Sequence, residues 1–256
     1  MGEWLSGVFS NPAVLSAIKV TFEMAFASTL ISAVLGVAIG LWLKNHVFTG
    51  KKAVVRINRT LLGVPPVVIG LLVYLLTMRG GPLGPLSLLF TVRGMVLAQV
   101  LIITPIISGM VFSYAESAVP AIRAFARTMG ADKKQTDRLI ISELRNEIYF
   151  CIITGFGRAI SEVGSVMLVG GNIKGHTRTM TTMNSLLKSQ GIYSEGIGLG
   201  VLLLIMAFIL QTLGDYVRKE QIRDENYCAP EENRKNGSVH RRSENRKRTG
   251  ARACRT

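Results

Sequence analysis

The strongest constraint on the fold is the spacing of charged residues, which are absent from long apolar blocks and gathered between them. A run of about 20 apolar residues crosses a hydrocarbon core about 30 Å thick, at about 1.5 Å per residue. Four such blocks carry no charge, and one carries a single Arg and a single Glu. The blocks are 24–43, 60–78, 94–115, 148–173 and 196–214. The sequence therefore predicts an all-α, polytopic membrane protein with about five transmembrane helices.

Composition supports this class, with 48% hydrophobic residues and a mean hydropathy of +0.35. The net charge of +14 sits mainly between the blocks and in a basic tail at 227–256, which we expect to be disordered. That tail has no aromatic residue beyond Tyr227 on which a base could stack, so we expect no nucleic-acid partner. The predicted domains are a transmembrane domain at 1–226 and this tail.

The distribution of Lys and Arg predicts the orientation, because basic loops stay on the cytoplasmic side. The basic segments are 44–59, 116–147 and the tail, and five spans place all three on one side. We therefore expect the N-terminus outside and the C-terminus in the cytoplasm. The segments around 79–82 and 171–195 then face outward.

The segment 116–147 is predicted to form a helix, an elbow and a second helix. Ile122, Phe125 and Met129 recur at helical spacing, and Gly130 is typical of a helix end. Asp132 with Gln135 is typical of an N-terminal capping box. We expect the apolar stripe of this segment to hold it at the membrane surface. An amphipathic connector lying on the lipid is the alternative.

Ala126, Gly130 and Ala131, with 135–136, Arg138 and Ile140 behind them, resemble the coupling loop with the EAA motif of ABC importer permeases. The resemblance implies a type I ABC importer permease fold, in which this loop docks on a separate cytoplasmic ATPase. The residues that it implies for ATPase coupling are Ala126, Arg127, Gly130, Ala131 and Asp132.

The second apolar block contains Pro65 and Pro66, which remove two helix donors and predict a kink. A simple packing kink is one interpretation. The run 63–72, with 80–85 and 95–99, also resembles permeases of the molybdate and tungstate branch of ABC importers. The resemblance implies that both prolines line a translocation pathway.

Arg158 and Glu162 are four residues apart in the fourth block, so they project from one helix face and can pair. Charges are costly inside a membrane, so the pair is expected to face protein or a water-filled path. In one hypothesis Arg158 supplies positive potential to an anion and Glu162 holds it in place. In the other, the pair is a buried salt bridge that fixes helix packing.

The stretch 170–182 is rich in Gly and Thr and contains Asn172 and Arg178. Backbone N–H groups, hydroxyls and an Arg can bind the oxygens of a tetrahedral oxyanion. A glycine-rich outer loop without a ligand is the alternative. The same stretch resembles tungstate permeases more than molybdate permeases.

No phosphate-binding loop, catalytic triad, metal-ligand spacing or CxxC is present in the sequence, so we expect no catalytic residue, metal or cofactor in this chain. The resemblance implies a permease subunit of an ATP-driven tungstate importer in a prokaryotic inner membrane. Its expected partners are a second copy, a cytoplasmic ATPase dimer that uses ATP, an extracytoplasmic oxyanion-binding protein and membrane lipid. The alternatives are a molybdate or sulfate permease, a proton-coupled anion carrier using Glu162, and a nucleic-acid binder acting through the tail.

Overall fold

The computed structural model describes residues 12–46 and 48–228, and the regular structure in these ranges is entirely helical. The chain divides into two compact units, Met1–Asp215 and Tyr216–Thr256. The predicted tail lies outside the described residues from 229 onward, so its boundary stays a prediction. The helices are α2 (Pro12–Asn45), α3 (Lys51–Leu62), α4 (Pro66–Thr77), η1 (Gly84–Leu86), α5 (Val92–Thr128), α6 (Lys133–Ser161), α7 (Gly164–Gly170), α8 (Met180–Ser189) and α9 (Tyr193–Cys228).

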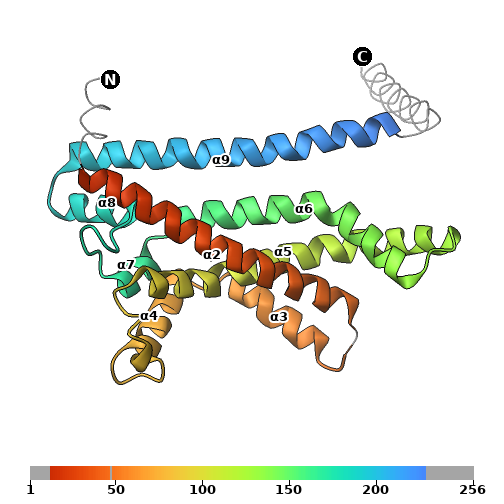
Figure 1. Ribbon diagram of the computed structural model, residues 1–256, viewed down its shortest axis with the longest axis horizontal. Coiled ribbons are helices and arrows are strands. Elements are labelled where there is room, and N and C mark those ends of the chain that lie inside the picture. The colour runs from red at the N-terminus through yellow and green to blue at the C-terminus, as the bar shows by residue number, and fades with distance from the viewer. Residues whose placement is uncertain (1–11, 47, 229–256) are drawn as a thin grey trace, which may run out of the picture. The chain divides into compact units, whose positions relative to one another are not determined.

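Helices α2 and α5 are each long and apolar enough to cross a membrane, and they pack closely against each other (Figure 1). A Cβ atom built on Gly36 of α2 would lie 2.8 Å from Ile107 Cβ of α5, and one on Gly40 would lie 2.9 Å from the Ser108 carbonyl oxygen. Only glycine permits backbones to approach this closely, as at many helix interfaces in membranes. The pair forms the centre on which the other helices assemble.

The second apolar block is not the single kinked helix that the prolines predict. It is divided between α3 and α4, which are bent by 101°. Pro65 is the N-cap of α4 and Pro66 its first residue, a position where a missing N–H costs nothing. The basic segment expected as a loop at 44–59 is helical from Lys51 onward.

The fourth block is also broken, because α6 ends at Ser161 and α7 begins at Gly164 at an angle of 58°. If each bent pair counts as one span, up to four helices or pairs pass the length and composition test for spans among the described residues, and α9 contributes a shorter apolar stretch, Tyr193–Ile209. The predicted number of five spans stays a prediction.

The segment 116–147 belongs to two long helices rather than to a separate surface element. α5 continues from the third apolar block to Thr128, and α6 begins at Lys133. Ile122 is partly buried against a cluster that includes Val119 of its own helix and Ile140 and Leu144 of α6. The expectation that the apolar stripe rests on the membrane was therefore wrong for Ile122, because this side chain fills the hairpin between the two helices.

Candidate functional site

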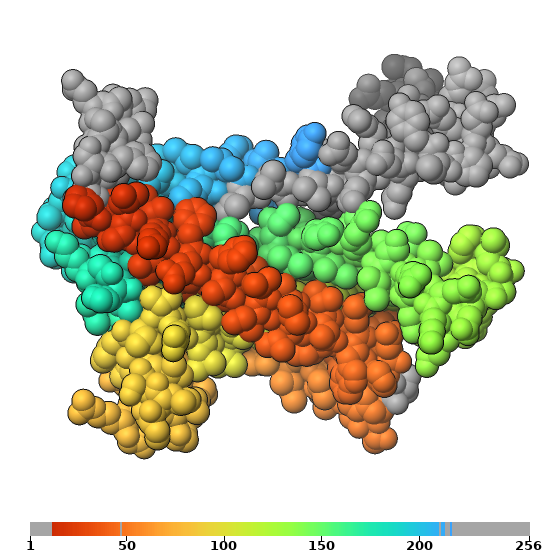
Figure 2. Space-filling model, in the orientation of Figure 1, coloured from red at the N-terminus to blue at the C-terminus, as the bar shows by residue number. Residues whose placement is uncertain are grey.

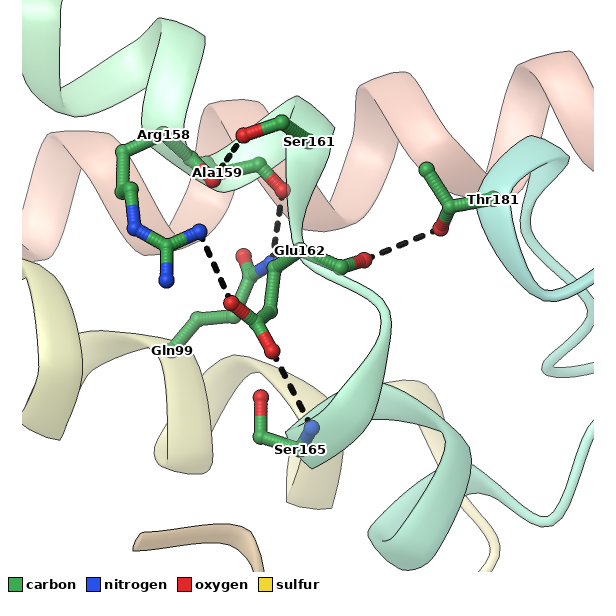
Figure 3. Close-up of polar contacts among 7 residues, drawn as sticks. All are labelled: Gln99, Arg158, Ala159, Ser161, Glu162, Ser165 and Thr181. Atoms are coloured by element: carbon green, nitrogen blue, oxygen red, sulfur yellow. Dashed lines mark hydrogen bonds and ion pairs between the residues drawn. The ribbon is translucent and has the colours of Figure 1, made fainter. Parts of the chain in front are cut away.

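The centre of the candidate site is Glu162, which lies at the break between α6 and α7 (Figure 3). Its side chain is 5% exposed, and each carboxylate oxygen has a partner. Oε2 lies 2.8 Å from a guanidinium nitrogen of Arg158, and Oε1 accepts the Ser165 backbone N–H at 3.1 Å. The carboxylate thus joins the last turn of α6 to the first turn of α7. The backbone oxygen of Glu162 accepts a hydrogen bond from the Thr181 hydroxyl of α8 at 2.9 Å.

The predicted pairing of Arg158 with Glu162 is confirmed, and the two partners differ in exposure. The Arg158 side chain is 33% exposed while its partner is almost completely buried. A guanidinium group has five N–H donors. In the described part of the chain, the ion pair with Glu162 is the one hydrogen-bonding or ionic contact found for the Arg158 guanidinium. The remaining donors can therefore bind another anion while Glu162 fixes the group.

Gln99 completes this region, and no role was predicted for it from the sequence. It is the only amide side chain in the block 94–115 and is 1% exposed. Its side-chain N–H donates to the Ala159 carbonyl of α6 at 2.8 Å, and its Oε1 accepts the Ser28 hydroxyl of α2 at 2.7 Å. One side chain of α5 thereby connects three helices, and its contact on α6 lies one turn before Glu162. A lone amide in an uncharged block is the signal that could have identified it.

Pro65 and Pro66 begin α4, and this helix packs on α7. A Cβ atom on Gly70 of α4 would lie 2.5 Å from Ser165 Cα, and one on Gly164 would lie 2.6 Å from Val67 Cγ2. The prolines therefore start the helix that packs against Ser165, the residue whose backbone N–H donates to the Glu162 carboxylate. The Ser165 hydroxyl at this contact is buried and has no hydrogen-bond partner in the residues described.

Asn172 and Arg178 are also brought together, in the turn between α7 and α8. Asn172 has a left-handed backbone with φ of 54°. Arg178 Nε donates to its side-chain oxygen at 3.2 Å, and a second guanidinium nitrogen donates to its carbonyl at 3.4 Å. The neighbouring threonine hydroxyls are used within the fold: Thr177 donates to the Gly170 carbonyl, and Thr179 caps α8. In this turn, Arg178 is the cationic side chain that lies on Asn172.

The predicted coupling residues form the turn at the other end of α6 (Figure 1). Gly130 has φ of 70°, and the Asp132–Gln135 capping box is present with both of its hydrogen bonds. Ala126 is buried, whereas Phe125 and Met129 are 60% and 70% exposed. Arg127 is exposed, as is Asp132 apart from its role in the cap. Two large apolar side chains therefore project at this turn.

Comparison with known proteins identifies the family to which this chain belongs. The chain is 37% identical over 203 residues to a tungstate uptake system permease protein of Peptoclostridium acidaminophilum, covering 79% of this chain and 89% of the relative. The chain belongs to the permease subunits of the tungstate and molybdate branch of ABC importers. It is 35% identical over 78% of its length to a probable anion ABC transporter permease of Haloferax volcanii, of which 89% is covered. Permeases named for molybdenum and sulfate transport align at 31% and 29% identity.

Solved structures support the fold of this ABC permease. A bacterial alginate ABC transporter, crystallised with an alginate-bound periplasmic protein, matches 84% of this chain and 82% of its own with a TM-score of 0.67 at 18% identity. No protein-family model matches the chain. The expectation of an all-α polytopic permease is confirmed by these matches and by the long apolar helices of the chain.

Proposed function

We propose that this permease is the membrane-spanning subunit of an ATP-driven importer and that its substrate is tungstate. The observation that carries the substrate is the 37% identity to a permease named for tungstate uptake, over 89% of that relative. Two permeases named for molybdenum transport are less similar, at 31% and 26% identity. Molybdate has the same charge and tetrahedral shape and is therefore the second candidate substrate.

The turn between α5 and α6 is the docking point that we propose for a cytoplasmic ATPase. Ala126 anchors the turn in the hairpin, Gly130 and Ala131 form it, and Asp132 caps the next helix. Phe125 and Met129 project from it and supply apolar surface to a partner. ATP binding to a dimer of the ATPase would draw two such turns together, and hydrolysis would release them. The movement is transmitted along α6, whose 29 residues span about 43 Å.

The translocation pathway in this proposal passes the far end of α6. Arg158 offers unused donors there, and Pro65 and Pro66 begin the helix that packs on the same region. In the proposed orientation Asn172 and Arg178, which are joined by a hydrogen bond, would face outward and receive the anion from an extracytoplasmic binding protein. A second copy of the chain would enclose the pathway. In this orientation the N-terminus lies outside and the C-terminus in the cytoplasm.

The contacts of Glu162 argue against a proton-coupled carrier. A proton relay needs access to water and a free carboxylate oxygen during its cycle. Glu162 is 5% exposed, and both of its oxygens are bonded within the chain. This geometry favours a structural role for the Glu162 carboxylate. We therefore propose that ATP rather than a proton gradient drives transport.

Uptake of labelled tungstate tests the proposal in membrane vesicles that contain this chain with its ATPase and binding protein. We expect uptake that depends on ATP, persists with a protonophore and resists a tenfold excess of molybdate or sulfate. Uptake blocked equally by molybdate would assign a shared tungstate and molybdate system. Uptake that ignores ATP and stops with the protonophore would overturn the ABC mechanism.

A further inference from the structure

Helix α3 carries positive charge that the described residues of the chain leave largely unneutralised. It contains Lys51, Lys52, Arg56 and Arg59, and the sequence has no Asp or Glu between Glu23 and Glu116. In the described residues, the one acidic contact of α3 joins Arg59 to Glu116 at 3.9 Å, and both of these side chains are more than half exposed. Exposed ion pairs of this kind contribute little to the free energy of folding. The cations of α3 therefore remain available to an anionic partner.

The side chains of α3 are sorted onto three faces at about 100° per residue. One face lies against α5, where Asn58 accepts a hydrogen bond from Ser108 at 3.1 Å and Lys51 lies 5.9 Å from the centre of the Phe112 ring. On a second face three exposed basic residues recur at helical spacing. On the side about 180° away from it, three exposed apolar residues do the same. The basic face consists of Lys52, Arg56 and Arg59, and the apolar face of Val54, Ile57 and Leu61.

The contacts of α3 place it at one level along α5. They reach from Ser108 to Glu116, a rise of about 12 Å that contains the end of the uncharged block at Ala115. The bend of 101° separates the direction of α3 from that of α4. In the space-filling view α3 (orange) is exposed at the surface beside the end of α2 (Figure 2).

Aromatic rings lie at the end of α2, which reaches the same part of α5 because Lys44 donates to the Glu116 carbonyl. Trp42 is half exposed and stacks on His46 with ring centres 5.3 Å apart, and Phe48 lies 5.4 Å from the same Trp. Trp is enriched where a membrane meets water because its ring is apolar and its N–H is polar. Basic, apolar and aromatic groups thus coincide where the uncharged part of α5 ends.

We propose that α3 is an interfacial helix that binds the anionic headgroups of phospholipids in the cytoplasmic leaflet. The inference rests on the membrane orientation in the proposed function. A lipid leaflet offers phosphates and acyl chains on opposite sides of its boundary, as the basic and apolar faces of α3 require. Lys52, Arg56 and Arg59 contact the phosphates, while Val54, Ile57 and Leu61 enter the acyl region. The α5-facing side holds the helix in place.

Lipid selectivity tests the basic face. The full chain is reconstituted in nanodiscs of mixed phosphatidylcholine and phosphatidylglycerol, and the lipid retained after detergent extraction is quantified. Each basic residue near a membrane surface changes the affinity by a factor of about five. We expect Lys52→Gln/Arg56→Gln/Arg59→Gln to lose most of the phosphatidylglycerol enrichment of the parent chain.

The matched control removes the same charge at exposed residues away from α3, as Arg79→Gln/Arg93→Gln/Lys174→Gln. It should retain the enrichment. Equal enrichment in the parent and in the α3 variant, or an equal loss in both triple variants, would overturn the proposal.

Fluorescence quenching tests the apolar face. Lipids brominated on their acyl chains should quench the added emission of Ile57→Trp and leave that of Arg56→Trp unquenched, each compared with the parent chain. Ile57→Trp without quenching would mean that a second copy or another protein covers this face, and would overturn the proposal. Neither experiment uses ATP or tungstate, so a failure here is distinct from a failure of uptake.

Discussion

At the scale of single residues, the two hypotheses for Arg158 and Glu162 make different predictions. Removing only the acid, in Glu162→Gln, leaves a cation without its partner. Loss of one member of a buried pair costs about 3–5 kcal/mol, and the partial exposure of Arg158 favours the lower end. We expect a marked fall in the thermal unfolding temperature of the purified chain, and loss of uptake.

The double variant Arg158→Gln/Glu162→Gln separates packing from transport. The amide oxygen that it introduces in place of the Glu162 carboxylate can still accept the Ser165 N–H, and no unpaired charge remains. We expect stability close to that of the parent, with ATP-dependent uptake reduced about tenfold or more because a charged hydrogen bond to the anion is lost. A double variant that is stable and keeps full ATP-dependent uptake would contradict a role of this pair in binding the anion.

A second residue-scale prediction concerns Gly130. Its φ of 70° lies in the left-handed region, and a Cβ atom there would meet no atom within 4 Å, so its backbone conformation rather than space requires glycine. Gly130→Pro fixes φ near −65° and removes the N–H that donates to the Arg127 carbonyl, so it should destabilise the turn by more than about 1 kcal/mol. We expect this variant to hydrolyse ATP without driving uptake. Gly130→Asn tolerates the conformation and should keep uptake, which makes it the matched control.

At the scale of elements, the contact between α4 and α7 holds both broken spans together. Gly70→Ala would place a Cβ atom 2.5 Å from the Ser165 backbone, which can move only with the helix. We expect a loss of about 1–3 kcal/mol, seen as a lower unfolding temperature. Gly157→Ala is the control, because its Cβ would meet nothing within 4 Å and alanine favours a helix. Equal stability of the two variants would contradict this packing.

The sequence predicted the helices and the contacts between nearby residues better than it predicted where the helices end. The capping box at Asp132 and the pair at Arg158 depend on residues three or four apart, which the helical period alone brings together. The break after Ser161 has no proline, and it depends on contacts with α4 and α8 that no local pattern contains. Gln99 was missed for the same reason, since its partners lie 60 and 71 residues away.

At the scale of the whole molecule, the bent pair α3 and α4 decides the topology. Five crossings put residue 49 in the cytoplasm and residue 80 outside, so the chain must cross the membrane between them. The 101° bend also permits a re-entrant segment, which would return the chain to the same side. The uncharged run 63–78, which follows the basic residues of α3, favours a crossing.

Labelling with a membrane-impermeant maleimide distinguishes the two topologies. Single cysteines are placed at Thr49, Gly80, Met129 and Lys174 in a chain with Cys228→Ser and Cys254→Ser, while Cys151 is buried and stays. Intact spheroplasts should label positions 80 and 174, and inside-out vesicles should label positions 49 and 129. Labelling of positions 49 and 80 from the same side would make α3 and α4 re-entrant. The cytoplasmic placement of the coupling turn would then require an N-terminus inside, because one crossing fewer precedes Met129.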